Sequence, residues 1–113
     1  MQYRNIPRLG CNASIIGFGS EHMLGRTEQE VDRTIKYAID KGINIYDLFW
    51  PQPEFRNAVS KAISGHRDEL ILQGHVGTVM IGDQYSRYRN VELSRKYFED
   101  FLRRFHTDYV DIG

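Results

Sequence analysis

Runs of β-favouring residues alternate with runs of helical periodicity along almost the whole chain of 113 residues. Strands are predicted at 13–17, 43–47, 70–72 and 109–112, and helices over 27–42, 55–63 and 97–105. Strand–helix–strand units of this length close through right-handed crossovers, so the alternation predicts an α/β fold with a parallel sheet. In such sheets the ligand sites lie at the carboxyl ends of the strands.

The first helix has clear signals at both ends. Thr27 followed by Glu30 forms a capping box, and Val31 and Ile35 then recur at helical spacing until Gly42 supplies a stop. Residues 2–12 are left as a turn or hairpin ahead of the first strand, and a long polar loop is expected between the third strand and the third helix.

Composition narrows the classes of partner. Fifteen basic residues balance fifteen acidic ones, which leaves no electrostatic case for binding nucleic acid or an anionic membrane. Cys11 is the single cysteine, so the chain can form no internal disulfide. No apolar run approaches the ~20 residues of a membrane span, and the start lacks a signal peptide, so a cytoplasmic location is expected.

The glycine pattern excludes several common nucleotide sites. Gly17 and Gly19 are followed by His22 where a dinucleotide fingerprint needs a third glycine, so these glycines are read as a tight turn. The sequence contains no Walker motif, no nucleophile elbow and no His-Glu-x-x-His helix.

Four short segments occur in a characteristic order. They are Tyr3-Arg4 with Leu9-Gly10, Ser14-Ile15-Ile16-Gly17-Phe18-Gly19, Gly42-Ile43-Asn44-Ile45-Tyr46-Asp47 and Thr107-Asp108-Tyr109-Val110-Asp111. In this order and at these separations they resemble the aldo/keto reductases. The resemblance implies a TIM-type (β/α)₈ barrel with an N-terminal hairpin closing its floor. Because such a barrel needs ~250 residues, residues 1–113 are expected to form one partial domain, about half of the barrel.

The resemblance also implies a chemistry, which is NADP(H)-linked hydride transfer to a small carbonyl substrate. In that family a tyrosine donates the proton, a lysine lowers its pKa, an aspartate pairs with the lysine and a histidine orients the substrate. Asp47 matches the aspartate, Gln52 stands where the tyrosine is expected, and His75 takes the place of the lysine. The family's histidine falls past Gly113. The catalytic residues implied here are therefore Asp47 and His75.

For the cofactor, the resemblance implies that Gly19, Ser20, Glu21 and Asp47 lie near the nicotinamide. Most contacts to the adenosine phosphate come from the family's last two strands. We therefore expect weak NADP(H) binding by this chain alone, and inactivity without the remaining βα units.

Two tyrosines could replace the missing phenol. Tyr85 and Tyr88 fall in the segment after the third strand, on the face where a barrel places its site, and His75 could perturb either of them. Loop tyrosines are more often surface or packing residues, and that interpretation is favoured. Trp50 beside Pro51 could wall a substrate pocket or simply pack under the proline-rich loop.

A metal site is the second functional hypothesis. Glu21, His22, Asp47 and His75 all follow predicted strands and together offer a ligand set for zinc or iron(II). None of their spacings is diagnostic, and solvated or hydrogen-bonded histidines are more common. His66 and His106 look like loop residues without a role.

The third hypothesis is a non-catalytic half-barrel or pairing module. Half of a barrel presents two open strand edges, and the last predicted strand has no helix after it. These edges predict association into a homo-oligomer.

Overall fold

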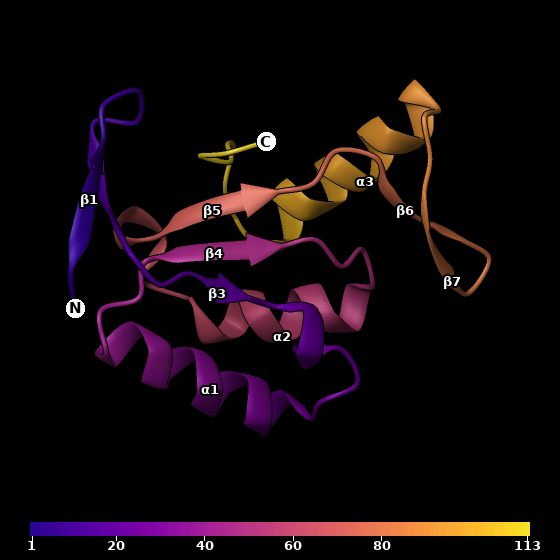
Figure 1. The fold of residues 1–113 in the computed structure, drawn as a ribbon. Coiled ribbons are helices and arrows are strands. Elements are labelled where there is room, and N and C mark those ends of the chain that lie inside the picture. The colour runs from indigo at the N-terminus through magenta and orange to yellow at the C-terminus, as the bar shows by residue number, and fades with distance from the viewer.

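Three parallel strands form the central sheet in the order β3–β4–β5 (Figure 1). The computed structural model describes residues 1–113, and the strands are β3 (Phe18–Gly19), β4 (Ile45–Leu48) and β5 (Ile71–Gly74). Gly19 pairs with Asp47, and Asp47 in turn pairs with Gln73. The predicted parallel βα arrangement is confirmed, and it brings the carboxyl ends of the three strands together.

Three helices accompany this sheet, namely α1 (Glu28–Asp40), α2 (Pro53–Ala62) and α3 (Val91–Arg104). α1 and α2 pack side by side, and α3 lies against α2 and β6 (Figure 1). The Thr27 hydroxyl accepts a hydrogen bond from the backbone N–H of Glu30 at 3.2 Å, while the Glu30 carboxylate accepts one from the Thr27 N–H at 2.9 Å. The predicted capping box is therefore confirmed.

The hydrophobic core lies between the sheet and the helices. Tyr46 and Leu72 point from adjacent strands into this layer, where they meet Ile35 of α1 and Val59 of α2, and all four side chains are fully buried. Because side chains alternate along a strand, the residue that follows each of these two strand residues faces the opposite side of the sheet. Asp47 and Gln73 lie on that side and are only partly buried.

The N-terminal hairpin expected at residues 2–12 is present as β1 (Tyr3–Ile6) paired antiparallel with β2 (Cys11–Ser14). The prediction of a strand at 13–17 is wrong. Ala13 and Ser14 end the hairpin, and the parallel strand begins only at Phe18. The Ser14 hydroxyl donates to the Ile16 carbonyl at 2.7 Å, and this local bond bends the chain out of a strand.

The prediction of a long polar loop after the third strand is also wrong, because this segment forms a second hairpin. β6 (Thr78–Ile81) pairs antiparallel with β7 (Gln84–Arg87) across a two-residue turn. Gly82 opens that turn with a φ of +58°, a conformation that costs glycine little. α3 then starts earlier than predicted, because the Asn90 side chain caps it by accepting from the Leu93 N–H at 2.9 Å.

The C-terminal segment runs beside β5 without forming the fourth strand predicted at 109–112. A single parallel bridge joins Ile112 to Gln73. The Asp111 carboxylate accepts a hydrogen bond from the Leu72 N–H at 2.8 Å. That side chain takes the place of a backbone partner, which interrupts the ladder. Two short 3₁₀ turns, Glu21–Met23 and Arg67–Glu69, complete the structure, and no helix is long and apolar enough to cross a bilayer.

Candidate active site

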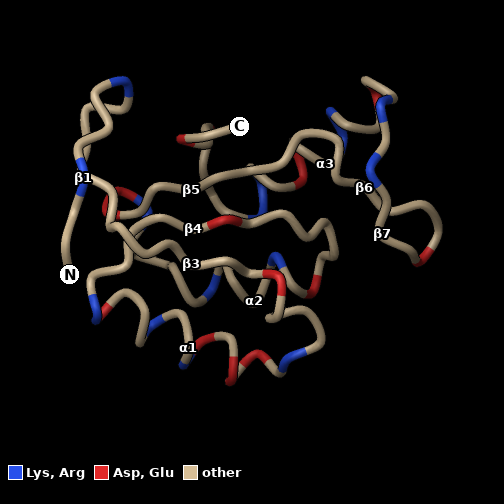
Figure 2. Tube along the Cα trace, viewed as in Figure 1, with Lys and Arg blue, Asp and Glu red and all other residues tan.

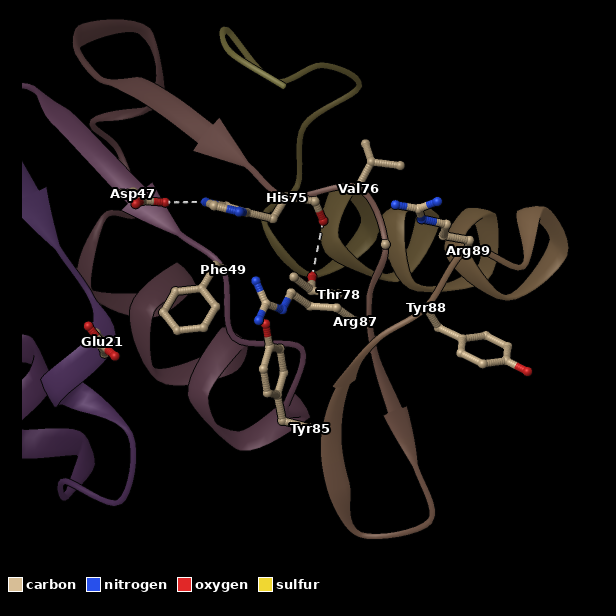
Figure 3. A pocket seen from close by; sticks show the side chains of 11 residues that line it. Glu21, Asp47, Phe49, His75, Val76, Thr78, Tyr85, Arg87, Tyr88 and Arg89 are labelled. Atoms are coloured by element: carbon tan, nitrogen blue, oxygen red, sulfur yellow. Dashed lines mark hydrogen bonds and ion pairs between the residues drawn. The ribbon is translucent and has the colours of Figure 1, made fainter.

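Asp47 and His75 meet at the carboxyl ends of two adjacent parallel strands. Asp47 lies in β4, and His75 directly follows β5. The His75 Nε2 atom lies 2.6 Å from Asp47 Oδ1, and both side chains are partly exposed (Figure 3). An ionised carboxylate only accepts hydrogen bonds, so Nε2 carries the hydrogen and Nδ1 remains available to another group. The pair can therefore hold a proton at a defined place.

A pocket of about 470 Å³ opens beside this pair (Figure 3). Its walls come from Glu21 after β3, from the ends of β4 and β5, and from the β6–β7 hairpin. Phe49 forms part of the wall, with its ring centroid 5.7 Å from both His75 and Tyr85. Trp50 extends this aromatic group, and its ring centroid lies 4.3 Å from that of Phe49 and 5.1 Å from that of Tyr85.

Arg56 fixes the segment that carries these aromatic rings. Its side chain is only 3% exposed, and it donates to the Trp50 carbonyl at 3.2 Å and to the Tyr97 carbonyl at 2.7 Å. The same guanidinium pairs with Asp100 at 3.0 Å. Burial lowers the pKa of Arg56, and Asp100 opposes that shift. The β4–α2 connection is thus tied to α3.

The residues predicted for cofactor binding divide into two groups. Ser20 is buried, and its N–H and hydroxyl both donate to the Asp47 carbonyl, at 3.2 Å and 2.6 Å. This hydroxyl therefore ties β3 to β4. Gly19 is open, since a Cβ built there meets nothing within 4 Å. Glu21 and Asp47 line the pocket, and the Glu21 carbonyl accepts from Trp50 Nε1 at 3.0 Å.

The four residues suggested as metal ligands do not form a ligand group. Of Glu21, His22, Asp47 and His75, only Asp47 and His75 are in contact. No group of three or more His, Cys, Asp and Glu side chains gathers with ligating geometry anywhere in the chain. His22 belongs to an exposed 3₁₀ turn and is not part of the pocket wall.

The remaining candidate residues differ in whether they face the pocket. Gln52 is the N-cap residue of α2 and lines a different pocket beside Phe55, so it does not face His75. Tyr85 points into the site pocket, whereas the Tyr88 ring is directed away from the Asp47–His75 pair (Figure 3). His66 pairs with Glu69 at 2.9 Å, which agrees with a loop residue.

Sequence reasoning missed Phe49 and the two arginines of the hairpin, Arg87 and Arg89, which also line the pocket. The available signal was Gly82-Asp83 between two β-favouring runs, which is typical of a two-residue hairpin turn. Pairing those runs would have placed Tyr85 and Arg87 on one face of a hairpin, although not at the pocket itself.

The fold and the position of the pocket define the class of protein. Parallel βα units, an N-terminal hairpin and a pocket at the carboxyl ends of the strands are the features of a TIM-type barrel, of which this chain contains part. An aldo-keto reductase from Bacillus halodurans in its holo form superposes with a TM-score of 0.82 at 27% identity, covering 97% of this chain and 38% of that one. An aldo-keto reductase from Klebsiella pneumoniae in complex with NADPH shares the fold, with a TM-score of 0.64 at 22% identity over 90% of this chain and 34% of that one.

Sequence comparison leads to the same family. The chain is 31% identical over 121 residues to the aldo-keto reductase YhdN of Bacillus subtilis and 27% identical over 129 residues to the protein tas of Escherichia coli. Both matches cover 99% of this chain and 37% of the relative. No protein-family model matches the sequence. The chain is related to the aldo-keto reductases, as its motifs predicted, and it spans less than two-fifths of the length of these relatives.

Proposed function

We propose that this chain supplies part of the active site of an NADP(H)-linked oxidoreductase that reduces a small carbonyl compound when its barrel is complete. The observation that carries the proposal is the Asp47–His75 pair, held at 2.6 Å beside a pocket at the carboxyl ends of the parallel strands. Ligand sites of such sheets lie at this edge. The relationship to the aldo-keto reductases supports this choice of chemistry.

The residues around the pocket suit the polar nicotinamide end of the cofactor. Glu21 and Asp47 offer carboxylate oxygens, which can accept hydrogen bonds from an amide or from ribose hydroxyls. Gly19 leaves open space at the same edge of the sheet. When bound, NADPH supplies the hydride that reduces the substrate carbon.

His75 and Asp47 would handle the proton in this reaction. As the carbonyl carbon gains a hydride, its oxygen must gain a proton to become a hydroxyl. Protonated His75 can donate that proton from Nδ1, because Asp47 holds Nε2 and stabilises the imidazolium by its charge. Asp47 therefore acts as the residue that orients His75, and the neutral imidazole then recovers its proton from solvent.

Isotope transfer tests this proposal. The protein as its gene encodes it would be incubated with NADPH carrying deuterium at C4 of the nicotinamide and with a panel of neutral and carboxylate-bearing aldehydes. We expect the product alcohol to gain one deuterium on its carbinol carbon. Absence of label and of NADPH oxidation with every aldehyde would refute the assigned chemistry.

A second candidate is a non-catalytic module that pairs with another chain. The observation that favours it is the open edge of the sheet at β3, which bonds only to β4. Unpaired edges of this kind are templates for association.

A further inference from the structure

Two arginines from the β6–β7 hairpin line the pocket without an acidic partner. Arg87 ends β7, and Arg89 follows it two residues later. Neither guanidinium makes an ion pair or a side-chain hydrogen bond to any residue of the chain, although both belong to the pocket wall. In Figure 3 the Arg87 guanidinium points toward Phe49 and the end of Tyr85.

The strand geometry explains why Tyr85 and Arg87 share a face. Residues two apart in a strand project to the same side of the ribbon, so both side chains of β7 turn into the pocket while Tyr88 turns outward (Figure 3). The tyrosine ring packs on the aromatic residues Phe49 and Trp50, and the arginine side chain reaches beyond it.

The hairpin is an ordered support for these two charges. Val79 in β6 is fully buried and Thr78 is nearly so. The Tyr88 N–H donates to the Gly77 carbonyl at 2.9 Å, which closes the base of the hairpin. Gly77 has a φ of +93°, and a Cβ there would meet the Tyr88 carbonyl oxygen at 3.2 Å. The positive φ together with the close approach favours glycine at this position, where the two ends of the hairpin meet.

Charge is distributed unevenly across the pocket. The side built by β3 and β4 carries Glu21 and Asp47, whereas the hairpin side carries Arg87 and Arg89. Figure 2 shows the acidic position in β4 and the basic positions at the end of β7. A ligand lying across this pocket would meet hydrogen-bond acceptors at one end and two unpaired cations at the other.

We propose that Arg87 and Arg89 bind the carboxylate or phosphate group of an anionic substrate whose carbonyl end lies at His75. This inference rests on the proposed function, since it names the substrate class for that site. Guanidinium groups bind carboxylates and phosphates through paired charge-assisted hydrogen bonds, which are stronger than neutral ones. Phe49 and Tyr85 would contact the apolar part of the ligand between its two ends.

Tryptophan fluorescence gives a direct binding assay, because Trp50 is the single tryptophan and lies 5.1 Å from Tyr85. The 113-residue chain would be titrated at constant ionic strength with malonate, with inorganic phosphate and with neutral malonamide. The variants are Arg87→Gln and Arg89→Gln. Arg8→Gln is the matched control, because Arg8 is exposed in the β1–β2 turn at the other end of the molecule.

We expect malonate or phosphate to bind and malonamide not to. Each pocket variant should weaken anion binding about tenfold, and Arg8→Gln should leave it unchanged. Equal binding by all variants, equal binding of malonamide, or no binding of either anion by a chain with native circular dichroism would overturn the proposal. Competition by NADP⁺, lost in Arg87→Gln, would assign the arginines to the cofactor phosphates and likewise overturn it. None of these results depends on hydride transfer, so failure here is distinguishable from failure of the proposed function.

Discussion

Tyr46 carries a phenol group that is buried inside the core. It is fully buried, and its hydroxyl has no hydrogen-bond partner in the structure. Burial raises the pKa of Tyr46 to about 12 from an ordinary value of 10.0. The unfolded chain therefore releases this proton near the ordinary pKa, while the folded chain retains it to higher pH.

The consequence is a stability contribution that disappears in alkali. Below the unfolded pKa the contribution of Tyr46 is fully present, and it falls by about 1.4 kcal/mol per pH unit as pH rises between the unfolded and folded values. Tyr46→Phe should abolish this dependence and, by removing an unpaired buried hydroxyl, leave neutral-pH stability equal or higher by ~1 kcal/mol. Urea unfolding at neutral and alkaline pH measures both effects.

Tyr37→Phe is the control for this prediction, because Tyr37 is 63% exposed on α1. It should keep the alkaline loss seen in the unaltered chain. If both variants lose stability equally with rising pH, the buried phenol is not its source.

At the scale of elements, α2 and α3 are joined by the ion pair of Arg56 and Asp100. Burial acts to raise the pKa of Asp100, but its hydrogen bonds to Arg104 and Arg56 and their charges outweigh this, so the pKa is lowered. A lowered carboxyl pKa stabilises the fold above the unfolded value, and the stabilisation is lost as pH falls through the folded one. The pair therefore holds the helices and the Trp50 segment together at neutral pH.

Asp100→Asn should lower the free energy of unfolding by about 3–5 kcal/mol at neutral pH, because Arg56 is left buried without its counter-charge. The difference from the unaltered chain should shrink in acid, where Asp100 is protonated. Thermal unfolding at pH 7 and in acid measures this, with Asp108→Asn on the exposed C-terminal segment as control. A loss no larger than that of the control would contradict the assigned role of the pair.

The elements also show what local patterns can and cannot predict. α1 was predictable because its capping box, apolar stripe and stopping glycine all lie within the same fifteen or so residues. The strand at 13–17 was not, because its apolar residues resemble a strand until the Ser14 side chain bonds to the Ile16 carbonyl. The second hairpin depended on one two-residue turn at Gly82-Asp83.

Some residues of the candidate site could likewise be predicted from the sequence, and others could not. Asp47 and His75 could be placed together from sequence, because each ends a strand and adjacent parallel strands end at one edge. Arg87 and Arg89 could not, since they reach the pocket only through the β6–β7 pairing and the contact at Gly77. Of the suggested metal set of Glu21, His22, Asp47 and His75, the structure brings only Asp47 and His75 into contact, because nearness in strand order does not bring side chains together.

For the whole molecule, the open sheet determines the expected assembly. β3 presents an unpaired edge, because it bonds only to β4, and the nearby Ile15 and Ile16 are 51% and 56% exposed. We expect the 113-residue chain to associate at about 50 micromolar, because such edges and apolar surface favour pairing between copies. Sedimentation velocity measures this, and a well-folded monomer at that concentration would contradict the expectation.

The central claim is that His75, oriented by Asp47, transfers the proton in an NADPH-dependent reduction. The most direct measurement compares kcat for His75→Gln and Tyr85→Phe in the protein as its gene encodes it, with His66→Gln as control. We predict that His75→Gln lowers kcat by ~10²–10⁴, while Tyr85→Phe and His66→Gln stay within severalfold of the unaltered protein. A Tyr85→Phe variant that loses this activity while His75→Gln retains it would contradict the account and make the Tyr85 phenol the proton donor.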